Sequence, residues 1–322
     1  MQSLTCRNCG SNQTYILPIG VYEPFFRLRV DTSKDEFLTF SRENSIPIGR
    51  RPLYERALRK AKRIMAPQRL GQARQFRTSM QFCSVCHGLS PCHEYTYEDL
   101  MGMYRDYRLE SYVKDRISLE GRWYERIADQ VGSHPLELKN RNTAVDGFLR
   151  RNASYFAGGQ MIDYAGGDGR FIPPYAFEQF EHIHILDASE VPIHPSVDAR
   201  KVTKVPVANP GSYDFMTCMH FLEHIGNPRQ FVVESSRLLV PGGLMYIEVP
   251  LELTEEVYEN CLQRFVDKPI GLHEHINLFD RTSIRALVRS IEELDLIDDS
   301  EGDVDLGWIT GNIGRFLVRK AK

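Results

Sequence analysis

The sequence predicts an α/β fold in which a mostly parallel sheet follows a cysteine-bearing domain. From residue 160 onward, short apolar segments alternate with helical segments, which is the pattern of parallel strands joined by crossover helices. A glycine-dense turn follows the first of these apolar segments. Two Cys-x-x-Cys pairs lie in the N-terminal part of the chain.

The elements of the α/β part can be placed from their apolar patterns. Strands are expected near four segments, 161–164, 184–186, 213–218 and 244–249. A helix over 228–239 precedes the last strand, and another begins near Arg281, with Asp280 or Thr282 as its cap. The apolar segment 314–318 is expected to form a final antiparallel strand.

Length and pattern divide the chain into three parts. With 322 residues, the chain can form two domains that each bury a core. We expect a cysteine-rich domain with a basic insert over 1–98, a helical linker over 99–150 and the α/β domain over 151–322.

The composition is that of a soluble globular protein, with 42% hydrophobic residues, 26% charged residues and a net charge of −3. This balance gives no argument for a nucleic-acid or membrane partner. No run approaches the roughly eighteen apolar residues of a membrane span, and the N-terminus has no apolar signal core. We therefore expect a cytoplasmic location, where paired cysteines indicate metal ligands before disulfides.

The turn after the first predicted strand combines an acid with glycines. Asp163 ends the strand, and Gly167 and Gly169 follow, where the absence of a Cβ lets the backbone approach a ligand. The spacing differs from the GxGxxG of a dinucleotide site. Asp187 closes the next strand and is followed by Ala188, at a place where a carboxylate can accept hydrogen bonds from ribose hydroxyls.

This pattern resembles the class I S-adenosylmethionine-dependent methyltransferases, whose first motif reads acid-x-Gly-x-Gly-x-Gly, with Ala165 here in place of the first glycine. Glu-His-Ile-x-x-Pro at 223–228 and Leu-x-Pro-Gly-Gly at 239–243 extend the resemblance. It implies a Rossmann-like, mostly parallel seven-stranded sheet and S-adenosylmethionine as cofactor. It also implies that Met219 and His220 contact the methionine end of the cofactor. The other implied cofactor residues are Asp163, Ala165, Gly167, Gly169, Asp187 and Ala188.

Residues 220–224 also match His-x-x-Glu-His, a zinc pattern of certain metalloproteases that requires both histidines on one helix. A strand is predicted directly before this run, and Gly226-Asn227-Pro228 would break any helix directly after it. We therefore set this alternative aside and expect Glu223 and His224 to anchor the loop.

A second polar cluster, Gly-Leu-His-Glu-His, lies at 271–275. Histidine has a pKa suited to a general base, and an adjacent carboxylate can orient its ring. Glu274, His275 and His220 are therefore the candidate catalytic residues, and the alternative is that the histidines only hydrogen-bond the loop. The run resembles the catalytic Tyr-x-Glu-His of zinc-bearing sugar C-methyltransferases from bacterial deoxysugar pathways. Leu272 stands at the tyrosine position, which leaves C-, O- and N-methylation open.

The two cysteine pairs, Cys6 with Cys9 and Cys83 with Cys86, together supply four thiolates for a closed, structural zinc site. Cys92, His87 and His93 are reserve ligands, and unmetallated thiols are the alternative. Seventy-three residues separate the pairs, many for a zinc ribbon, so we infer an insert between them. The sugar C-methyltransferases also carry two such pairs ahead of the cofactor domain.

The resemblance implies a methyltransferase whose partner is a small polar acceptor, a sugar or nucleotide-sugar. Two other functions stay open: methylation of RNA or protein recruited by the front domain, and cofactor binding without catalysis. The segment 42–77 has eleven Lys and Arg against two Glu, and forms either a solvated helix face or a phosphate-binding patch. It has no aromatic residues interleaved at stacking spacing, which argues against nucleic acid.

Overall fold

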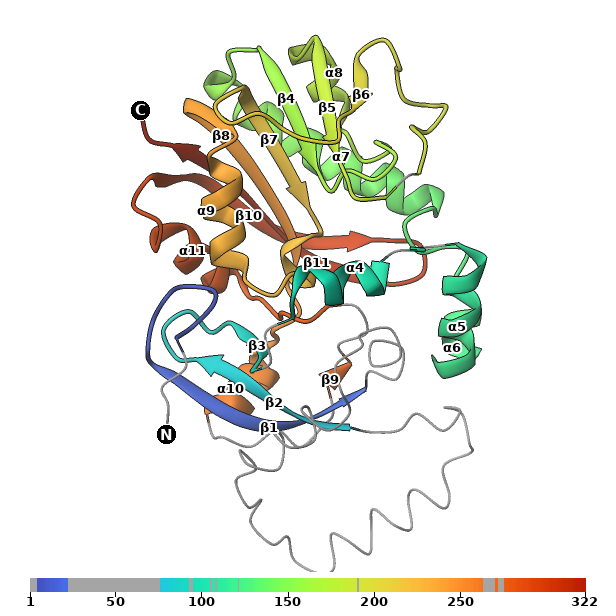
Figure 1. Cartoon of the computed structure of the whole chain (residues 1–322), viewed down its shortest axis with the longest axis vertical. Helices are drawn as coiled ribbons and strands as arrows, with labels where there is room; N and C mark the ends of the chain where they lie inside the picture. The colour runs from blue at the N-terminus through green and yellow to red at the C-terminus, as the bar shows by residue number, and fades with distance from the viewer. Residues whose placement is uncertain are drawn as a thin grey trace, which may run out of the picture.

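A computed structural model describes residues 5–22, 76–92, 95–104, 106–107, 109–120, 122–189, 191–262, 270–271 and 275–322. Two sheets organise this part of the chain (Figure 1): a seven-stranded sheet with the order β10-β11-β8-β7-β4-β5-β6, and a four-stranded sheet with the order β3-β2-β1-β9. Glu274, His93 and nearly all of the basic segment 42–77 lie outside the described residues.

The seven-stranded sheet is mostly parallel, which confirms the predicted fold class. Its parallel strands are β4 (Gln160–Tyr164), β5 (His182–Leu186), β6 (Val202–Lys204), β7 (Tyr213–Met219) and β8 (Leu239–Pro250). β11 (Thr310–Lys320), which contains the predicted final strand, runs antiparallel to β8 and to the edge strand β10 (Leu294–Asp305).

The edge strand β10 was not expected, because eight acidic residues between 292 and 305 remove the apolar pattern of a strand. Two of its central carboxylates are paired with arginines instead. Arg281 and Arg285 both contact Asp299, and Arg151 contacts Asp298. β6, also unexpected, has only three residues.

Helices cover both faces of the large sheet (Figure 1). α7 (Pro135–Arg151) and α8 (Pro174–Gln179) pack on one face, and α9 (Pro228–Ser236) and α11 (Arg281–Arg289) pack on the other. Successive residues of a central strand enter opposite cores: Phe215 packs with the α7 side and Met216 with the α9 side. The central strands are apolar on both faces for this reason.

The limits of the helices refine the sequence prediction. α9 ends at Ser236, shortly before the predicted end at 239. Of the two caps considered for α11, Asp280 is the N-cap, and its carboxylate accepts a hydrogen bond of 2.7 Å from the N–H of Ser283.

The smaller sheet joins distant parts of the chain. β1 (Thr14–Tyr22) and β2 (Phe76–Cys83) form an antiparallel pair, and β3 (Leu89–Pro91) lies beside β2. The fourth strand, β9 (Ile270–Gly271), comes from the C-terminal half and pairs with β1. Leu253 and Cys261, the latter in α10 (Glu255–Leu262), share one buried cluster with Leu17 and Phe82 of the sheet.

Short helices complete the described part of the chain. They are α4 (Tyr97–Tyr104), α5 (Glu110–Glu120), α6 (Arg122–Glu125) and the 3-10 helices η1 (Ala153–Tyr155) and η2 (Leu222–His224). Within the described ranges, no helix has both the length and the apolar character needed to cross a membrane.

A buried ion pair fixes α7 to the sheet. Glu248 of β8 is fully buried, and Nη2 of Arg141 in α7 lies 3.1 Å from its Oε1. Arg315 Nε lies 3.4 Å from Oε2, to which Tyr246 donates a hydrogen bond of 2.9 Å. Burial alone would raise the pKa of Glu248, but His220 and Arg141 lower it to about 2. The carboxylate is therefore ionised in the core.

We expect Arg141→Met to lower the free energy of unfolding by about 3 kcal/mol, because it removes one partner of a buried ion pair. Arg150→Met on the same helix is the matched control, since Arg150 is exposed and pairs with the exposed Glu178. Its effect should be far smaller. Urea denaturation of both variants measures the difference, and equal losses would contradict a structural role for the buried pair.

Candidate active site

The turn after β4 presents backbone at the carboxyl edge of the sheet. Ala165, Gly167 and Gly169 have φ angles of 57°, 58° and 83°, so Ala165 adopts the left-handed conformation that glycine favours. A Cβ on Gly167 would meet no atom within 4 Å. A Cβ on Gly166 would lie 2.2 Å from Oδ2 of Asp163. Gly166 therefore has no room for a side chain, whereas Gly167 borders open space.

Two carboxylates flank this turn. Asp163 is buried, and its Oδ1 accepts a hydrogen bond of 2.7 Å from Thr217 Oγ1. Its Oδ2 has no hydrogen-bond partner within the described part of the chain, and burial raises the pKa of this carboxyl to about 7. Asp187, after β5, accepts hydrogen bonds from the N–H groups of Gly167 (2.9 Å) and Ser189 (2.7 Å).

These features fit S-adenosylmethionine. Asp163 has a buried carboxylate oxygen that is free, among the described residues, to accept a hydrogen bond, the glycine turn borders open space, and Asp187 supplies a second acceptor, as the resemblance implies for this cofactor. Met219 ends β7, on the other side of β4, and Ala188 is exposed beside Asp187. The predicted cofactor residues thus gather where the carboxyl ends of parallel strands form ligand sites.

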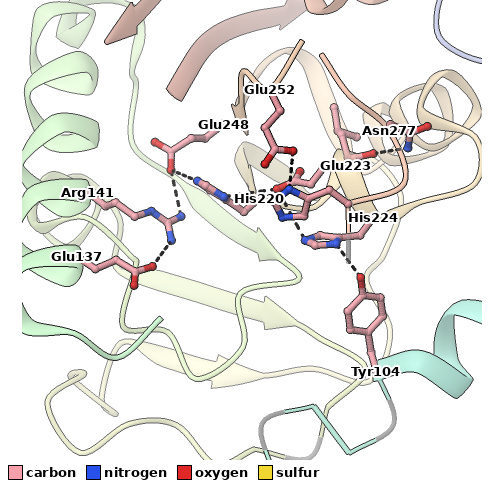
Figure 2. Close-up of polar contacts among 11 residues, drawn as sticks. Tyr104, Glu137, Arg141, His220, Glu223, His224, Glu248, Glu252 and Asn277 are labelled. Atoms are coloured by element: carbon pink, nitrogen blue, oxygen red, sulfur yellow. Dashed lines mark hydrogen bonds and ion pairs between the residues drawn. The ribbon is translucent and has the colours of Figure 1, made fainter. Parts of the chain in front are cut away.

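The end of β7 leads into a second polar cluster (Figure 2). His220 follows the strand with a left-handed φ of 51°, and the chain then forms η2. His220 and His224 therefore do not share an α-helix, as the metalloprotease pattern would require. The N–H groups of Ile276 and Asn277 both donate to the backbone oxygen of Glu223, at 2.7 and 3.0 Å. This pairing brings the neighbouring His275 beside η2.

Three histidines surround the carboxyl group of Glu223 (Figure 2). His220 Nδ1 lies 3.5 Å from Glu223 Oε1, and His224 Nε2 lies 3.8 Å from the same oxygen. A ring nitrogen of His275 lies within 4.8 Å of ligand atoms of both Glu223 and His224. The Nε2 atom of His220 lies 3.3 Å from Oε1 of Glu248, which joins this cluster to the buried ion pair.

Outer contacts orient two of these rings. His224 Nδ1 lies 2.7 Å from the hydroxyl oxygen of Tyr104, and His275 Nδ1 lies 2.7 Å from Oε2 of Glu252. The two rings meet edge to face, with their centroids 4.8 Å apart. Both imidazole rings are therefore held in defined positions beside the carboxyl group of Glu223.

Burial sets the protonation of the cluster. Glu223 is fully buried, and neither carboxyl oxygen has a hydrogen-bond partner among the residues that the structure describes. Burial raises the pKa of Glu223 to about 7. The pKa of His220 is lowered, because burial and the charge of Arg141 disfavour its cation. The neutral form of His220 is therefore favoured.

The structure brings two of the three candidate catalytic residues, His220 and His275, to one cluster; the third, Glu274, lies outside the described residues. The carboxylate that contacts His275 is Glu252, which sequence reasoning did not single out. Its place just beyond a parallel strand was the available signal, because such positions line ligand sites. Nothing in the sequence indicates that Tyr104, in a segment expected to connect domains, would contact this cluster.

The four paired cysteines converge beside the smaller sheet. Because Thr14 of β1 pairs with Cys83 of β2, the hairpin joins the two pairs whatever length of chain separates the strands. Cys6 Sγ lies 3.6 Å from Cys86 Sγ, and Cys9 Sγ lies 3.7 Å from Cys83 Sγ. All four sulfurs lie within 4.8 Å of one another. Four sulfurs about 2.3 Å from a tetrahedral zinc would lie about 3.8 Å apart, so these thiols fit the ion.

The surroundings of the cysteines also suit thiolates. Asn8 donates from its backbone N–H to Cys6 Sγ (3.4 Å) and from Nδ2 to Cys86 Sγ (3.5 Å). The residue after each pair has a left-handed φ, 76° at Gly10 and 62° at His87, which turns the chain around the sulfurs. Both pairs therefore have the same local turn.

The cysteine cluster contacts the first turn of α11. Asn8 Nδ2 donates a hydrogen bond of 2.7 Å to the backbone oxygen of Ser283. His87, considered above as a reserve ligand, lies with Nδ1 2.8 Å from Oδ2 of Asp280. Cys92 is buried outside the four-cysteine group.

Comparisons with known proteins agree with this architecture. Residues 138–291 match the family model described as a methyltransferase domain. Two relatives named ubiquinone biosynthesis O-methyltransferase are 33% identical over 67 residues (Dechloromonas aromatica) and 40% identical over 124 residues (Colwellia psychrerythraea). These matches cover 20% and 36% of this chain, and only 27% and 48% of the two relatives.

Solved structures show limited similarity. The 1,6-didemethyltoxoflavin-N1-methyltransferase of Burkholderia thailandensis is 14% identical, with a TM-score of 0.45 over 62% of this chain and 86% of that one. A putative methyltransferase of Bacillus halodurans is also 14% identical, with a TM-score of 0.43 over 56% of this chain and 100% of that one.

Over residues 138–291, the chain therefore matches a methyltransferase domain. The match over 138–291 supports the methyltransferase expected from the glycine turn and the segment after β7. The matched region begins within α7, whose buried face packs on the large sheet.

Asp187→Ala is expected to weaken binding of S-adenosylhomocysteine by about 10- to 100-fold, the cost of losing hydrogen bonds to a carboxylate. Asp198→Ala is the control, because Asp198 pairs with the exposed Arg200 on the surface of the same domain. Isothermal titration calorimetry of both variants tests the assignment. An unchanged affinity in Asp187→Ala would remove Asp187 from the cofactor site.

Proposed function

We propose that the protein transfers the methyl group of S-adenosylmethionine to a hydroxyl group of a small polar acceptor. The observation that carries this proposal is that two loops with polar side chains lie next to each other at one edge of the sheet. Asp163 and the glycine turn follow β4, and the histidine cluster follows the neighbouring strand β7. Thr217 of β7 donates a hydrogen bond to Asp163, so the two loops are directly linked.

The cofactor supplies a methyl group on a positively charged sulfur, which needs little further activation. The protein's own residues must align the acceptor with that methyl group and take up the acceptor's proton. As the acceptor oxygen gains the methyl group, its hydroxyl proton would pass to His275 or His220. Both residues lie next to Glu223 rather than in open solvent.

The contacts of His275 support its role as a base. A carboxylate only accepts hydrogen bonds, so Glu252 accepts the Nδ1 hydrogen of His275, and the lone pair of the neutral ring is then on Nε2. Glu252 thus has the orienting function that the sequence suggested for Glu274. In His220, the lowered pKa favours the neutral form that a base needs.

Oxygen as the receiving atom is supported by the names of the Dechloromonas and Colwellia relatives, both O-methyltransferases. A sugar or nucleotide-sugar acceptor is a narrower proposal. Its support is the resemblance of the paired cysteines and of the run at 271–279 to sugar C-methyltransferases.

Methyl transfer can be tested with the full chain, methyl-labelled S-adenosylmethionine and three sets of acceptors: phenols, nucleotide-sugars and amines. We expect labelled product from an oxygen acceptor in one of the first two sets. His275→Ala should lower kcat by about 100-fold or more while affinity for S-adenosylhomocysteine is unchanged. His182→Ala, at an exposed position in β5, is the matched control.

Two outcomes would count against the proposal. Transfer to amines alone would exclude oxygen as the receiving atom. No transfer to any set, together with no affinity for S-adenosylhomocysteine, would exclude a methyltransferase altogether.

We also propose that Cys6, Cys9, Cys83 and Cys86 hold a structural zinc ion. Four thiolates would fill the tetrahedral coordination shell and leave no open position for chemistry. The ion would then fasten the β1–β2 hairpin, which contacts the first turn of α11 through Asn8.

Cys83→Ser is expected to lose zinc and to melt at a lower temperature, because binding of a structural metal contributes to folding free energy. Substitution with Co²⁺ identifies the ligands, since thiolate coordination produces an intense near-ultraviolet absorption band. Cys92→Ala is the control and should keep both the metal and the band. A wild-type protein without a thiolate band would contradict the zinc site.

A further inference from the structure

We propose that Glu223, His224 and His275 bind a divalent metal ion that takes nitrogen and oxygen ligands, such as Mn²⁺ or Fe²⁺. This group of residues is distinct from the four cysteines. The inference rests on the proposed methyl transfer and deepens it, because the ion would lie where the acceptor hydroxyl is expected.

The three ligand groups already converge. One ligand atom from each residue lies within 4.8 Å of the other two, and His224 Nε2 is 3.8 Å from Glu223 Oε1. Ligands held about 2.1 Å from one ion lie about 3–4 Å apart. Small side-chain movements would therefore close the coordination shell.

Outer hydrogen bonds prepare the histidines as ligands. His275 Nδ1 donates to Glu252, so the lone pair of its neutral ring is on Nε2. Tyr104 Oη lies 2.7 Å from Nδ1 of His224, and the opposite nitrogen of that ring faces Glu223. Metal-binding histidines characteristically have such a partner on the other ring nitrogen, which fixes the ring and its tautomer.

Glu223 supplies an independent observation. Its side chain is fully buried and directed among the histidines (Figure 2), and neither oxygen has a hydrogen-bond partner within the described residues. A buried carboxyl group without partners is unfavourable and calls for an explanation. A cation between Glu223, His224 and His275 would satisfy all three groups at once.

The ligand types and their exposure define what the ion could do. Two imidazoles and one carboxylate fill three positions of an ion that takes four to six ligands. The side chains of His224 and His275 are 15% and 27% exposed, whereas Glu223 closes the inner side. The remaining positions are therefore accessible to an acceptor.

A hydroxyl group bound to the ion would lose its proton more readily. That proton would pass to His220, whose Nδ1 lies 3.5 Å from Glu223 Oε1, and the acceptor oxygen would then gain the methyl group. The ion refines the role of His275, which becomes a ligand rather than the base. Loss of activity in a His275 variant fits both roles, so metal binding itself must be measured.

Titration of the zinc-loaded full chain with MnCl₂, followed by the electron paramagnetic resonance of free Mn²⁺, tests the site. Mn²⁺ prefers oxygen and nitrogen ligands, so the four thiolates do not compete. We expect one Mn²⁺ per chain, with affinity lowered about 100-fold or more in Glu223→Gln. Tyr104→Phe removes only the outer contact of His224 and should lower affinity about tenfold. His182→Ala should bind as the wild type does.

The absence of Mn²⁺ binding in the wild type, or equal affinity in Glu223→Gln, would overturn the metal site. Affinity for S-adenosylhomocysteine, measured on the same samples, shows whether each variant is folded. A wild type that binds S-adenosylhomocysteine but not Mn²⁺ overturns the metal site and leaves the proposed methyl transfer standing. A wild type that binds Mn²⁺ but no S-adenosylhomocysteine supports the metal site and counts against methyl transfer.

Discussion

The buried charge of Glu248 determines how the elements around the site are arranged. Because this carboxylate is fully buried, its charge must be balanced by groups inside the protein. Arg141 comes from α7, Arg315 from β11 and His220 from the end of β7, so one charge holds three elements to β8. The same contact turns the other ring nitrogen of His220 toward Glu223. The orientation of His220 in the site therefore depends on a charge that is buried in the core of the sheet.

Two glutamates at the same depth behave differently because their neighbours differ. Glu248 lies between two arginines and a histidine, which lower its pKa to about 2 despite burial. Glu223 has histidines rather than arginines next to its carboxyl group among the described residues, and burial raises its pKa to about 7. The first is a permanent anion that stabilises structure. The second can still gain or lose a proton near neutral pH, which is a property that a reaction site can use.

Local features of the site were predictable from sequence, and long-range ones were not. The central strands and the glycine turn follow from apolar runs and residues within a few positions of one another, and the structure confirms these elements. Glu252 and Tyr104 meet the histidine cluster only after folding, so their contacts with it cannot be predicted from their own segments. The strand β10 escaped prediction because it is rich in carboxylates, two of which, Asp298 and Asp299, are paired with arginines from α7 and α11. The gap between the cysteine pairs looked anomalous because the pairing of β1 with β2 is also a long-range contact.

The parallel pairing of β1 with β9 bears on how this protein could be recombined with others. Val21 pairs with Ile270, and the buried cluster under this sheet contains both Leu17 and Cys261. A chimaera joined between the front part and the methyltransferase part would inherit only part of that sheet and part of its core. Exchange of the front part would require the matching segment around 250–280 to travel with it. Two regions separated by more than half of the chain would thus have to be exchanged together, both in laboratory recombination and in evolution.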